Sequence, residues 1–138
     1  MNILIIDAQG GGIGRQLTAS LKQSGINAEI TAVGTNTAAT TAMIKAGADY
    51  AATGENAVVV ASRKADIITG PIGIVIADSL YGEITPAMAV AVAQSRAVRV
   101  LIPYSHCDNI IIGSSDKGIG TYVELATEKI INIISSDT

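Results

Sequence analysis

Aromatic side chains are almost missing from this sequence of 138 residues. It contains no Trp and no Phe, and only four Tyr. Platforms on which unpaired bases could stack are therefore scarce, which argues against the common single-strand nucleic-acid readers. Positive charge is scarce as well, since nine Lys and Arg face twelve Asp and Glu for a net charge of -3. Without a broad positive field the chain is a poor binder of phosphate backbones, and we expect no nucleic-acid partner.

Cysteine and histidine each occur once, as Cys107 and His106. One cysteine excludes an internal disulfide, and one residue of each type excludes a zinc-finger cluster, so we expect no metal site. Because the two residues are adjacent, their side chains point to opposite sides of an extended segment, and adjacency implies no Cys-His nucleophile pair. A half-buried thiol is the simpler interpretation of Cys107.

Long apolar runs are absent too. No uninterrupted stretch approaches the roughly 18 to 20 residues that a membrane span needs, so we expect no membrane partner. The first residues, Met1 to Leu4, show neither the basic region nor the small-residue cleavage site of a signal peptide. Together with the single cysteine, these absences predict a cytoplasmic protein.

The chain is instead rich in aliphatic residues. Hydrophobic residues make up 49% of it, so Ile, Val, Leu and Ala must fill the core, and fourteen Gly punctuate the sequence. The length fits one domain of ordinary size, since domains most often have about 100 to 150 residues. No repeat, low-complexity tract or charged tail divides the chain, and we expect a single domain over residues 1–138.

The first thirty residues predict the opening of a βαβ unit. Ile3 to Ile6 is a short β-branched run typical of a strand buried on both faces of a parallel sheet. It ends at Asp7 and is followed by a glycine cluster. Ile13, Leu17 and Leu21 then recur at helical spacing up to a stop at Ser24 and Gly25.

The middle of the chain repeats this alternation. We expect strands over residues 28–33, 49–52 and 66–69, a helix ending near Ala46, and a second helix from about 56 to 63. Two segments stay ambiguous. Residues 58–60 are compatible with a strand as well as a helix, and residues 72–80 alternate like a strand where a crossover helix is due.

The last third contains a clear helix start and two further strands. Thr85 followed by Pro86 is typical of a helix N-terminus, and this helix should run to about Ser95. We expect strands over 98–102 and 110–112, and a closing helix over 121–134. About seven residues separate the two strands, too few for a parallel crossover, so this pair should be antiparallel. The fold class is therefore α/β, a doubly wound, mostly parallel Rossmann-like sheet of about six strands with an antiparallel edge strand.

Polar residues and glycines follow the predicted strands more than they precede them. The helix-to-strand returns are ordinary turns, whereas the strand-to-helix loops place glycine beside hydroxyls, amides and carboxylates. Ligands of doubly wound sheets bind at the carboxyl edge, where these loops gather. We therefore predict a small-molecule site there, made of Asp7, Gln9, Gly10, Gly11, Gly12, Ile13, Gly14, Gly34, Thr35, Asn36, Thr53, Gly54, Glu55, Asn56, Gly70 and Pro71.

The glycine loop is the strongest single motif in the sequence. Its glycines let the backbone approach a ligand, and a helix N-terminus offers free N–H groups to a phosphate. The dinucleotide fingerprint G-x-G-x-x-G is incomplete, because Arg15 or Leu17 stands where its last glycine belongs. No acidic residue ends the second strand to hold a ribose, and no Lys-Ser/Thr pair follows to complete a Walker motif. A nucleotide or dinucleotide cofactor is possible, but its identity stays open.

Several candidate side chains have a structural alternative. Asp7 could hold a metal or a ligand hydroxyl, but binding a loop amide is the simpler role. Glu55 and Asn56 stand where a helix begins, so capping explains them equally well. Asp78 and Glu83 flank a turn and could form a carboxylate pair. The loop from Tyr104 to Asn109, which contains His106 and Cys107, lies at the same predicted edge and could line the pocket.

Five motifs in order give the chain a resemblance to a known family. They run from Asp7 to Gly14, Gly34 to Asn36, Ala52 to Ala57, Gly70 to Ile74 and Gly82 to Pro86. Together they resemble a bacterial family catalogued as domain of unknown function 3842. Cys107 looks like a position that the family often fills with cysteine, whereas Ala8 replaces an expected glycine. The family has no established activity, so the resemblance implies a small Rossmann-like domain and no catalytic residues.

Three functions fit these observations. The first is binding of a nucleotide or another small phosphorylated or anionic ligand, with residues 10–14 around the charge and Thr35, Asn36, Glu55 and Asn56 supplying polar contacts. The second is a small enzyme using Asp7, Glu55 or Cys107, and the third is a non-catalytic structural or regulatory subunit. A chain of one domain has no separate substrate lobe, so we expect a homo-oligomer that completes any enzyme site between subunits.

Overall fold

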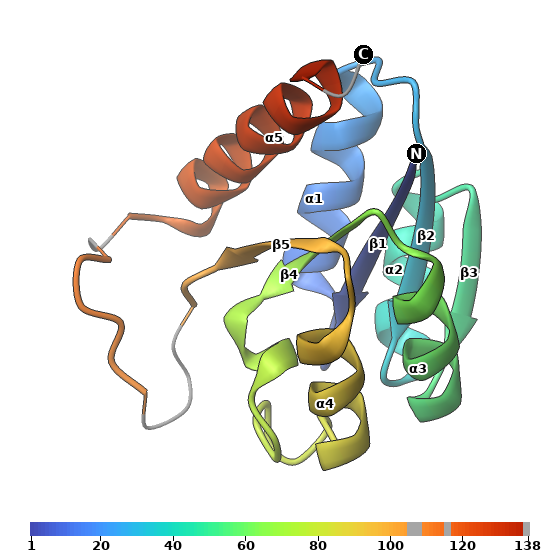
Figure 1. The fold of residues 1–138 in the computed structure, drawn as a ribbon, viewed down its shortest axis with the longest axis vertical. Coiled ribbons are helices and arrows are strands. Elements are labelled where there is room, and N and C mark those ends of the chain that lie inside the picture. Colours follow the sequence, from blue (N-terminus) through green and yellow to red (C-terminus); the bar gives the residue numbers. More distant parts are fainter. Residues whose placement is uncertain (105–108, 115–116, 137–138) are drawn as a thin grey trace.

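The computed structural model describes residues 1–104, 109–114 and 117–136. Its centre is a parallel sheet of five strands in the order β3-β2-β1-β4-β5 (Figure 1). The strands are β1 (Asn2–Asp7), β2 (Glu29–Gly34), β3 (Tyr50–Thr53), β4 (Ile67–Pro71) and β5 (Val98–Ile102). The helices are α1 (Gly12–Gln23), α2 (Thr37–Lys45), α3 (Glu55–Lys64), α4 (Pro86–Gln94) and α5 (Ile119–Ser136), with a 3₁₀ turn η1 (Ile72–Val75). A doubly wound α/β sheet was predicted, and the parallel sheet with helices on both faces confirms it.

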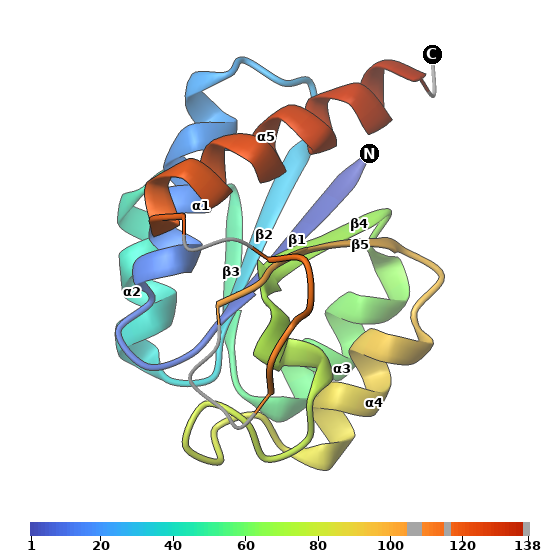
Figure 2. The same cartoon turned by 90° about the vertical axis from the view of Figure 1, so that its left-hand side faces the viewer.

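Two hydrophobic layers enclose the sheet. The helices α1 and α5 pack on one face, and α3 and α4 pack on the other, so that the sheet lies between them (Figure 2). Side chains of β1 alternate between the two layers, with Ile3 and Ile5 in the first and Leu4 and Ile6 in the second. All four are at most 1% exposed. The central strand therefore reads as a continuous apolar run because both of its faces are covered.

Several local predictions are confirmed. Thr85 caps α4, and its Oγ1 accepts a hydrogen bond from the N–H of Met88 at 3.2 Å, with Pro86 at the first helical position. Residues 58–60 lie in α3, which excludes the strand alternative. Val123, Ala126 and Ile130 of α5 are buried in the core, as expected for the apolar stripe of the closing helix.

The predicted antiparallel edge strand is wrong. All pairings of the sheet are parallel, and residues 110–112 belong to no strand. Ile110 and Ile112 are 87% and 92% exposed, and the N–H of Ser114 turns back to the carbonyl of Ile111. Three β-branched residues favour a strand only where a neighbouring strand pairs with them, and the described residues offer none. The sheet thus has five strands where about six were expected.

The ambiguous segment 72–80 is neither a strand nor a crossover helix. It forms η1 and then a series of turns, and α4 provides the crossover to β5. Asp78, Leu80 and Tyr81 adopt positive φ angles in these turns. The alternation of Ile72, Ile74 and Ile76 does not form a strand, because Gly73 and Ile76 close a turn through a backbone hydrogen bond.

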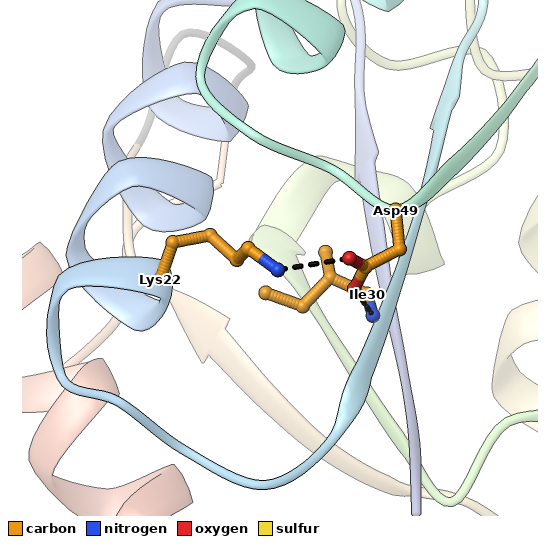
Figure 3. A network of polar contacts seen from close by, with 3 residues as sticks. All are labelled: Lys22, Ile30 and Asp49. Atoms are coloured by element: carbon orange, nitrogen blue, oxygen red, sulfur yellow. Dashed lines mark hydrogen bonds and ion pairs between the residues drawn. The ribbon is translucent and has the colours of Figure 1, made fainter.

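A polar link ties the first helix to the amino-terminal end of the sheet. Asp49 forms an ion pair with Lys22 Nζ at 2.9 Å, and it accepts a hydrogen bond from the N–H of Ile30 at 2.9 Å (Figure 3). These contacts lie at the edge opposite to the predicted site. None of the helices in the described part of the chain has the length and apolar character of a membrane span.

Candidate functional site

The order of the strands creates a crevice at the carboxyl edge. From β1 the chain winds outward to β2 and β3, and it then returns to place β4 on the other side of β1. The loops that leave β1 and β4 run to helices on opposite faces of the sheet. In doubly wound sheets this switch point is where ligands bind.

A pocket of about 190 Å³ opens at this point. One side is the loop after β1 and the first turn of α1, and the other consists of side chains from β4, from the turns after η1, from the end of β5 and from α5. The lining residues are Asp7, Ala8, Gln9, Gly10, Gly11, Gly12, Ile13, Gln16, Pro71, Leu80, Tyr104 and Ile119. The structure thus brings the predicted glycine loop and Pro71 together around one cavity.

A larger hollow of about 360 Å³ lies between α3 and the strands β1 to β3. Its walls include Val33, Ala57 and Val60, together with Asn2 and Lys64 near the amino-terminal ends of the strands. None of the polar residues predicted for the site lines it. We therefore place the candidate site at the smaller pocket, on the carboxyl edge.

Asp7 anchors the glycine loop from inside. Its Oδ1 accepts a hydrogen bond from the N–H of Ala8 at 2.8 Å, and its Oδ2 accepts one from the N–H of Gly14 at 2.6 Å. The side chain is buried, and burial raises the pKa of the Asp7 carboxyl above 3.8 although both amides lower it. Of the roles predicted for Asp7, the structure therefore shows the simpler one, a carboxylate that binds amides of the loop.

Two glycines of the loop are required by packing. Gly11 has a φ of 73°, and a Cβ there would lie 2.8 Å from the Cα of Ala39. A Cβ on Gly14 would lie 2.5 Å from the Sδ of Met43 and 2.9 Å from the Cβ of Asp7. These positions need glycine for the close approach of α1 to α2 and β1, whether or not a ligand binds.

The other two glycines have no such structural reason. A Cβ on Gly10 or Gly12 would meet no atom within 4 Å, and neither residue has a positive φ. Both residues are exposed, and their N–H groups donate to no described residue. The N–H of Gly14, by contrast, is already bound to Asp7. Any anion at this helix terminus therefore has the amides of Gly10 and Gly12 available to it.

Glu83, a carboxylate that was not predicted for the site, connects the loops after β1 and β2. The Oε1 of Glu83 accepts hydrogen bonds from the N–H of Gln9 at 3.0 Å, from Thr35 Oγ1 at 2.7 Å and from Asn36 Nδ2 at 2.7 Å. Burial alone would raise the pKa of Glu83, but these three donors outweigh it and lower the pKa below 4.5. Gln9 itself has a φ of 53°, so Glu83 holds a strained residue of the glycine loop.

Glu83 was considered only as a partner of Asp78. In the structure it contacts the loops after β1 and β2, and its charge also helps to raise the pKa of Asp7. The signal that could have found it is the motif from Gly82 to Pro86, in which a carboxylate stands between a turn glycine and the cap of α4.

The polar residues after β2 have structural partners. Asn36 caps α2, since its Oδ1 accepts from the N–H of Ala39 at 2.9 Å, and its Nδ2 also donates to the carbonyl of Gln9 at 3.0 Å. Thr35 donates to Glu83. A Cβ on Gly34 would lie 2.5 Å from the backbone nitrogen of Thr40, so this glycine permits close packing of β2 and α2.

The loop after β3 lies outside the pocket lining. Thr53 Oγ1 pairs with Thr40 Oγ1 at 2.7 Å, and Glu55 accepts a hydrogen bond from Thr85 Oγ1 at 2.6 Å. Gly54, with a φ of 104°, is the cap residue of α3, and Asn56 is exposed in the first turn of that helix. These four predicted residues thus form a neighbouring group on the carboxyl edge.

The remaining candidates flank the crevice or lie outside the described residues. Gly70 and Pro71 are the last residues of β4, and a Cβ on Gly70 would press on the carbonyl of Ile6. Tyr104 lines the pocket, whereas His106 and Cys107 lie outside the described residues. Among the residues that are described, no three His, Cys, Asp or Glu side chains gather as a metal site would require.

Comparisons with known proteins identify the family of this chain. No curated protein is a significant match to this chain. A solved structure that it resembles is a dodecameric FMN-dependent UbiX-like decarboxylase from Escherichia coli O157:H7, with a TM-score of 0.49 and 19% sequence identity. The match covers 94% of this chain and 76% of the decarboxylase chain. The family described as domain of unknown function 3842 matches residues 2–135, and the chain belongs to this family.

Proposed function

We propose that this chain binds a small phosphorylated or anionic ligand, such as a nucleotide, in the pocket beside the glycine loop. The observation that carries the proposal is the pair of amides on Gly10 and Gly12, to which no described residue is bound. Both residues line the pocket, both have open space where a Cβ would stand, and neither N–H has a partner among the described residues. Backbone amides at the start of a helix favour negative charge.

The pocket also suggests how the ligand lies. A volume of about 190 Å³ is below the roughly 300 Å³ at which pockets for whole cofactors begin. The pocket therefore receives one part of a nucleotide, and the rest extends over the exposed loop residues Gln9 and Gly10. Leu80, Tyr104 and Ile119 form the wall opposite the glycines, so an apolar or unsaturated group would lie against them.

A homo-oligomer is part of this proposal. Ile110 and Ile112 stand in the sequence between β5 and α5, and both are almost fully exposed. Tyr104 and Ile119, at the two ends of this segment, line the pocket. Burial of the isoleucines against a second copy would stabilise an assembly and fix the wall of the pocket.

Isothermal titration calorimetry tests the ligand proposal. The wild-type chain is titrated with a panel of nucleotides, sugar phosphates and small carboxylates, and the compound that binds best is then titrated into Gly12→Val. A Cβ at Gly12 would meet no atom within 4 Å, so we expect the folded protein to accept a valine there, and its methyl groups would cover the amides that face the ligand. We expect binding to be lost while the melting temperature stays near that of the wild type.

Ala38→Val is the matched control. Ala38 is an exposed residue in the first turn of α2 and does not line the pocket, so the variant adds a valine side chain to an equivalent helix start. This variant should bind the ligand like the wild type. Unchanged affinity in Gly12→Val, or a wild-type chain that binds no member of the panel, would contradict the proposal.

A further inference from the structure

Glu83, which binds the glycine loop through Gln9, has one carboxylate oxygen without a partner among the described residues. Oε1 accepts all three hydrogen bonds that reach this side chain, and Oε2 accepts none from any described residue. Glu83 is half-buried, so Oε2 can be reached from solvent. One oxygen thus accepts from Gln9, Thr35 and Asn36, which hold the carboxylate in place, and the other has no partner among the described residues.

The position of this carboxylate is as informative as its geometry. Thr35 and Asn36 follow β2 directly, where dinucleotide-binding sheets carry the acidic residue that holds ribose hydroxyls. The sequence has no acidic residue there. The structure brings Glu83 to the same place from 47 and 48 positions further along the chain.

Glu83 also contacts the glycine loop next to Gly10. The N–H of Gln9 lies 3.0 Å from Glu83 Oε1, and Gly10 is the next residue, about 3.8 Å away along the backbone. A phosphate on the amides of Gly10 and Gly12 and a hydroxyl on Oε2 would therefore be neighbouring groups of one small ligand.

We propose that Glu83 binds adjacent hydroxyl groups of a phosphorylated sugar, either free or within a nucleotide, and thereby selects ligands that carry them. The inference rests on the proposed function, since it requires the phosphate to lie at Gly10 and Gly12. A carboxylate accepts charge-assisted hydrogen bonds from hydroxyls, which are about twice as strong as neutral ones. The three donors on Oε1 keep the carboxylate in place before the ligand arrives.

Calorimetry with two pairs of compounds tests the inference on the wild-type chain. The first pair is AMP and 2′,3′-dideoxy-AMP, and the second is ribose 5-phosphate and n-butyl phosphate, which keeps the phosphate monoester without hydroxyls. We expect the hydroxylated member of at least one pair to bind about tenfold more tightly or better. Preference in the second pair identifies a free sugar phosphate as sufficient, and preference in the first pair alone identifies a nucleotide.

Glu83→Gln separates the hydroxyl contact from the support of the loops. The amide oxygen can still accept from Gln9, Thr35 and Asn36, while an NH₂ group replaces Oε2 and can offer only a neutral hydrogen bond. We expect the preference for hydroxyls to fall to about twofold or less, with the melting temperature close to that of the wild type. Glu128→Gln makes the same chemical change at an exposed carboxylate of α5, outside the site, and should keep the preference.

The outcomes distinguish the two proposals. Equal binding within both pairs by the wild type, or an undiminished preference in Glu83→Gln, overturns the role of Glu83 and leaves the phosphate site at Gly10 and Gly12 intact. If no phosphate compound binds to the wild-type chain, both the proposed function and this inference are wrong. The comparison within the wild type needs no variant, so a misfolded Glu83→Gln would not prevent the test.

Discussion

Asn36 Nδ2 donates a hydrogen bond to Glu83 Oε1 at 2.7 Å, although 47 positions separate the two residues in the sequence. The same Asn36 caps α2 through its Oδ1. One side chain therefore connects the start of a helix to the turns that precede α4. Through the N–H of Gln9, Glu83 extends this connection to the glycine loop.

This relationship predicts that Glu83 stabilises the fold. Glu83→Ala removes the acceptor of three hydrogen bonds, and because the group is half-buried, we expect a loss of about 1 kcal/mol or somewhat more in the free energy of unfolding. Urea denaturation followed by circular dichroism measures this change. Glu83→Gln keeps one acceptor oxygen, so its free energy of unfolding should fall clearly less than that of Glu83→Ala. Equal stability of the alanine variant and the wild type would show that water replaces the carboxylate without cost.

The glycine loop offers a matched pair of substitutions. Gly14→Ala places a Cβ 2.5 Å from the Sδ of Met43 and 2.9 Å from the Cβ of Asp7, and overpacking of this kind costs about 1 to 3 kcal/mol. Gly12→Ala adds the same methyl group in open space two residues earlier. It should leave the melting temperature unchanged or raise it slightly, because alanine favours helix more than glycine. The division of the loop into packing and ligand-facing glycines fails if both variants melt alike.

The contacts of Asp49 lead us to expect that the stability of the folded state falls in acid. The N–H of Ile30 and the ammonium of Lys22 hold the pKa of its carboxyl below 3.8, so the folded state releases this proton more readily than the unfolded chain does. The stabilisation that Asp49 provides is therefore fully present at pH values above 3.8. It is lost as the pH falls through the lower pKa that Asp49 has in the folded state. The lowered pKa of Glu83 likewise makes the folded state less stable in acid. The raised pKa of Asp7 has the opposite effect and favours the folded state at lower pH.

Melting temperatures measured from neutral pH to about pH 3, below the usual carboxyl range, check this effect. Asp49→Asn should lower the melting temperature at neutral pH, and the difference from the wild type should shrink in acid. Glu128→Gln is the control, since it removes an exposed carboxylate on α5 without changing Asp49 or Lys22. A difference between Asp49→Asn and the wild type that stays constant with pH would exclude an electrostatic origin.

The exposed isoleucines between β5 and α5 predict an assembly. Ile110 and Ile112 are 87% and 92% exposed, and burial of each side chain between subunits would contribute about 1.5 to 3 kcal/mol. Light scattering coupled to size-exclusion chromatography should show an oligomer for the wild type. The double variant Ile110→Ser with Ile112→Ser should shift it towards the monomer.

Ile44→Ser combined with Val90→Ser is the control for this shift. These two residues are each 50% exposed and lie on α2 and α4, away from the segment between β5 and α5. This control variant should keep the assembly of the wild type. A monomeric wild-type chain, or an assembly unaffected by the two isoleucine changes, would rule out this segment as an interface.

The fold could be predicted wherever local sequence determines local structure. The apolar run of β1 and the Thr85-Pro86 start of α4 carry their own signals, because burial on both faces and capping depend on neighbours in the chain. The segment 110–112 shows the limit of this reasoning. Its β-branched residues favour a strand, but a strand needs a partner, and no local pattern reveals whether one is present.

The sequence by itself determined an α/β fold with a mostly parallel sheet and a glycine loop after its first strand, although the antiparallel edge strand that it also predicted is wrong. Only the tertiary structure decided which glycines serve packing, since Met43 and Ala39 come from another helix, and only it decided that Glu83 binds the loops after β1 and β2. The physical reason is the same in both cases. Hydrophobic periodicity, caps and turns act over a few residues, whereas close packing and a shared hydrogen-bond acceptor join residues dozens of positions apart, and these contacts exist only after the sheet has formed.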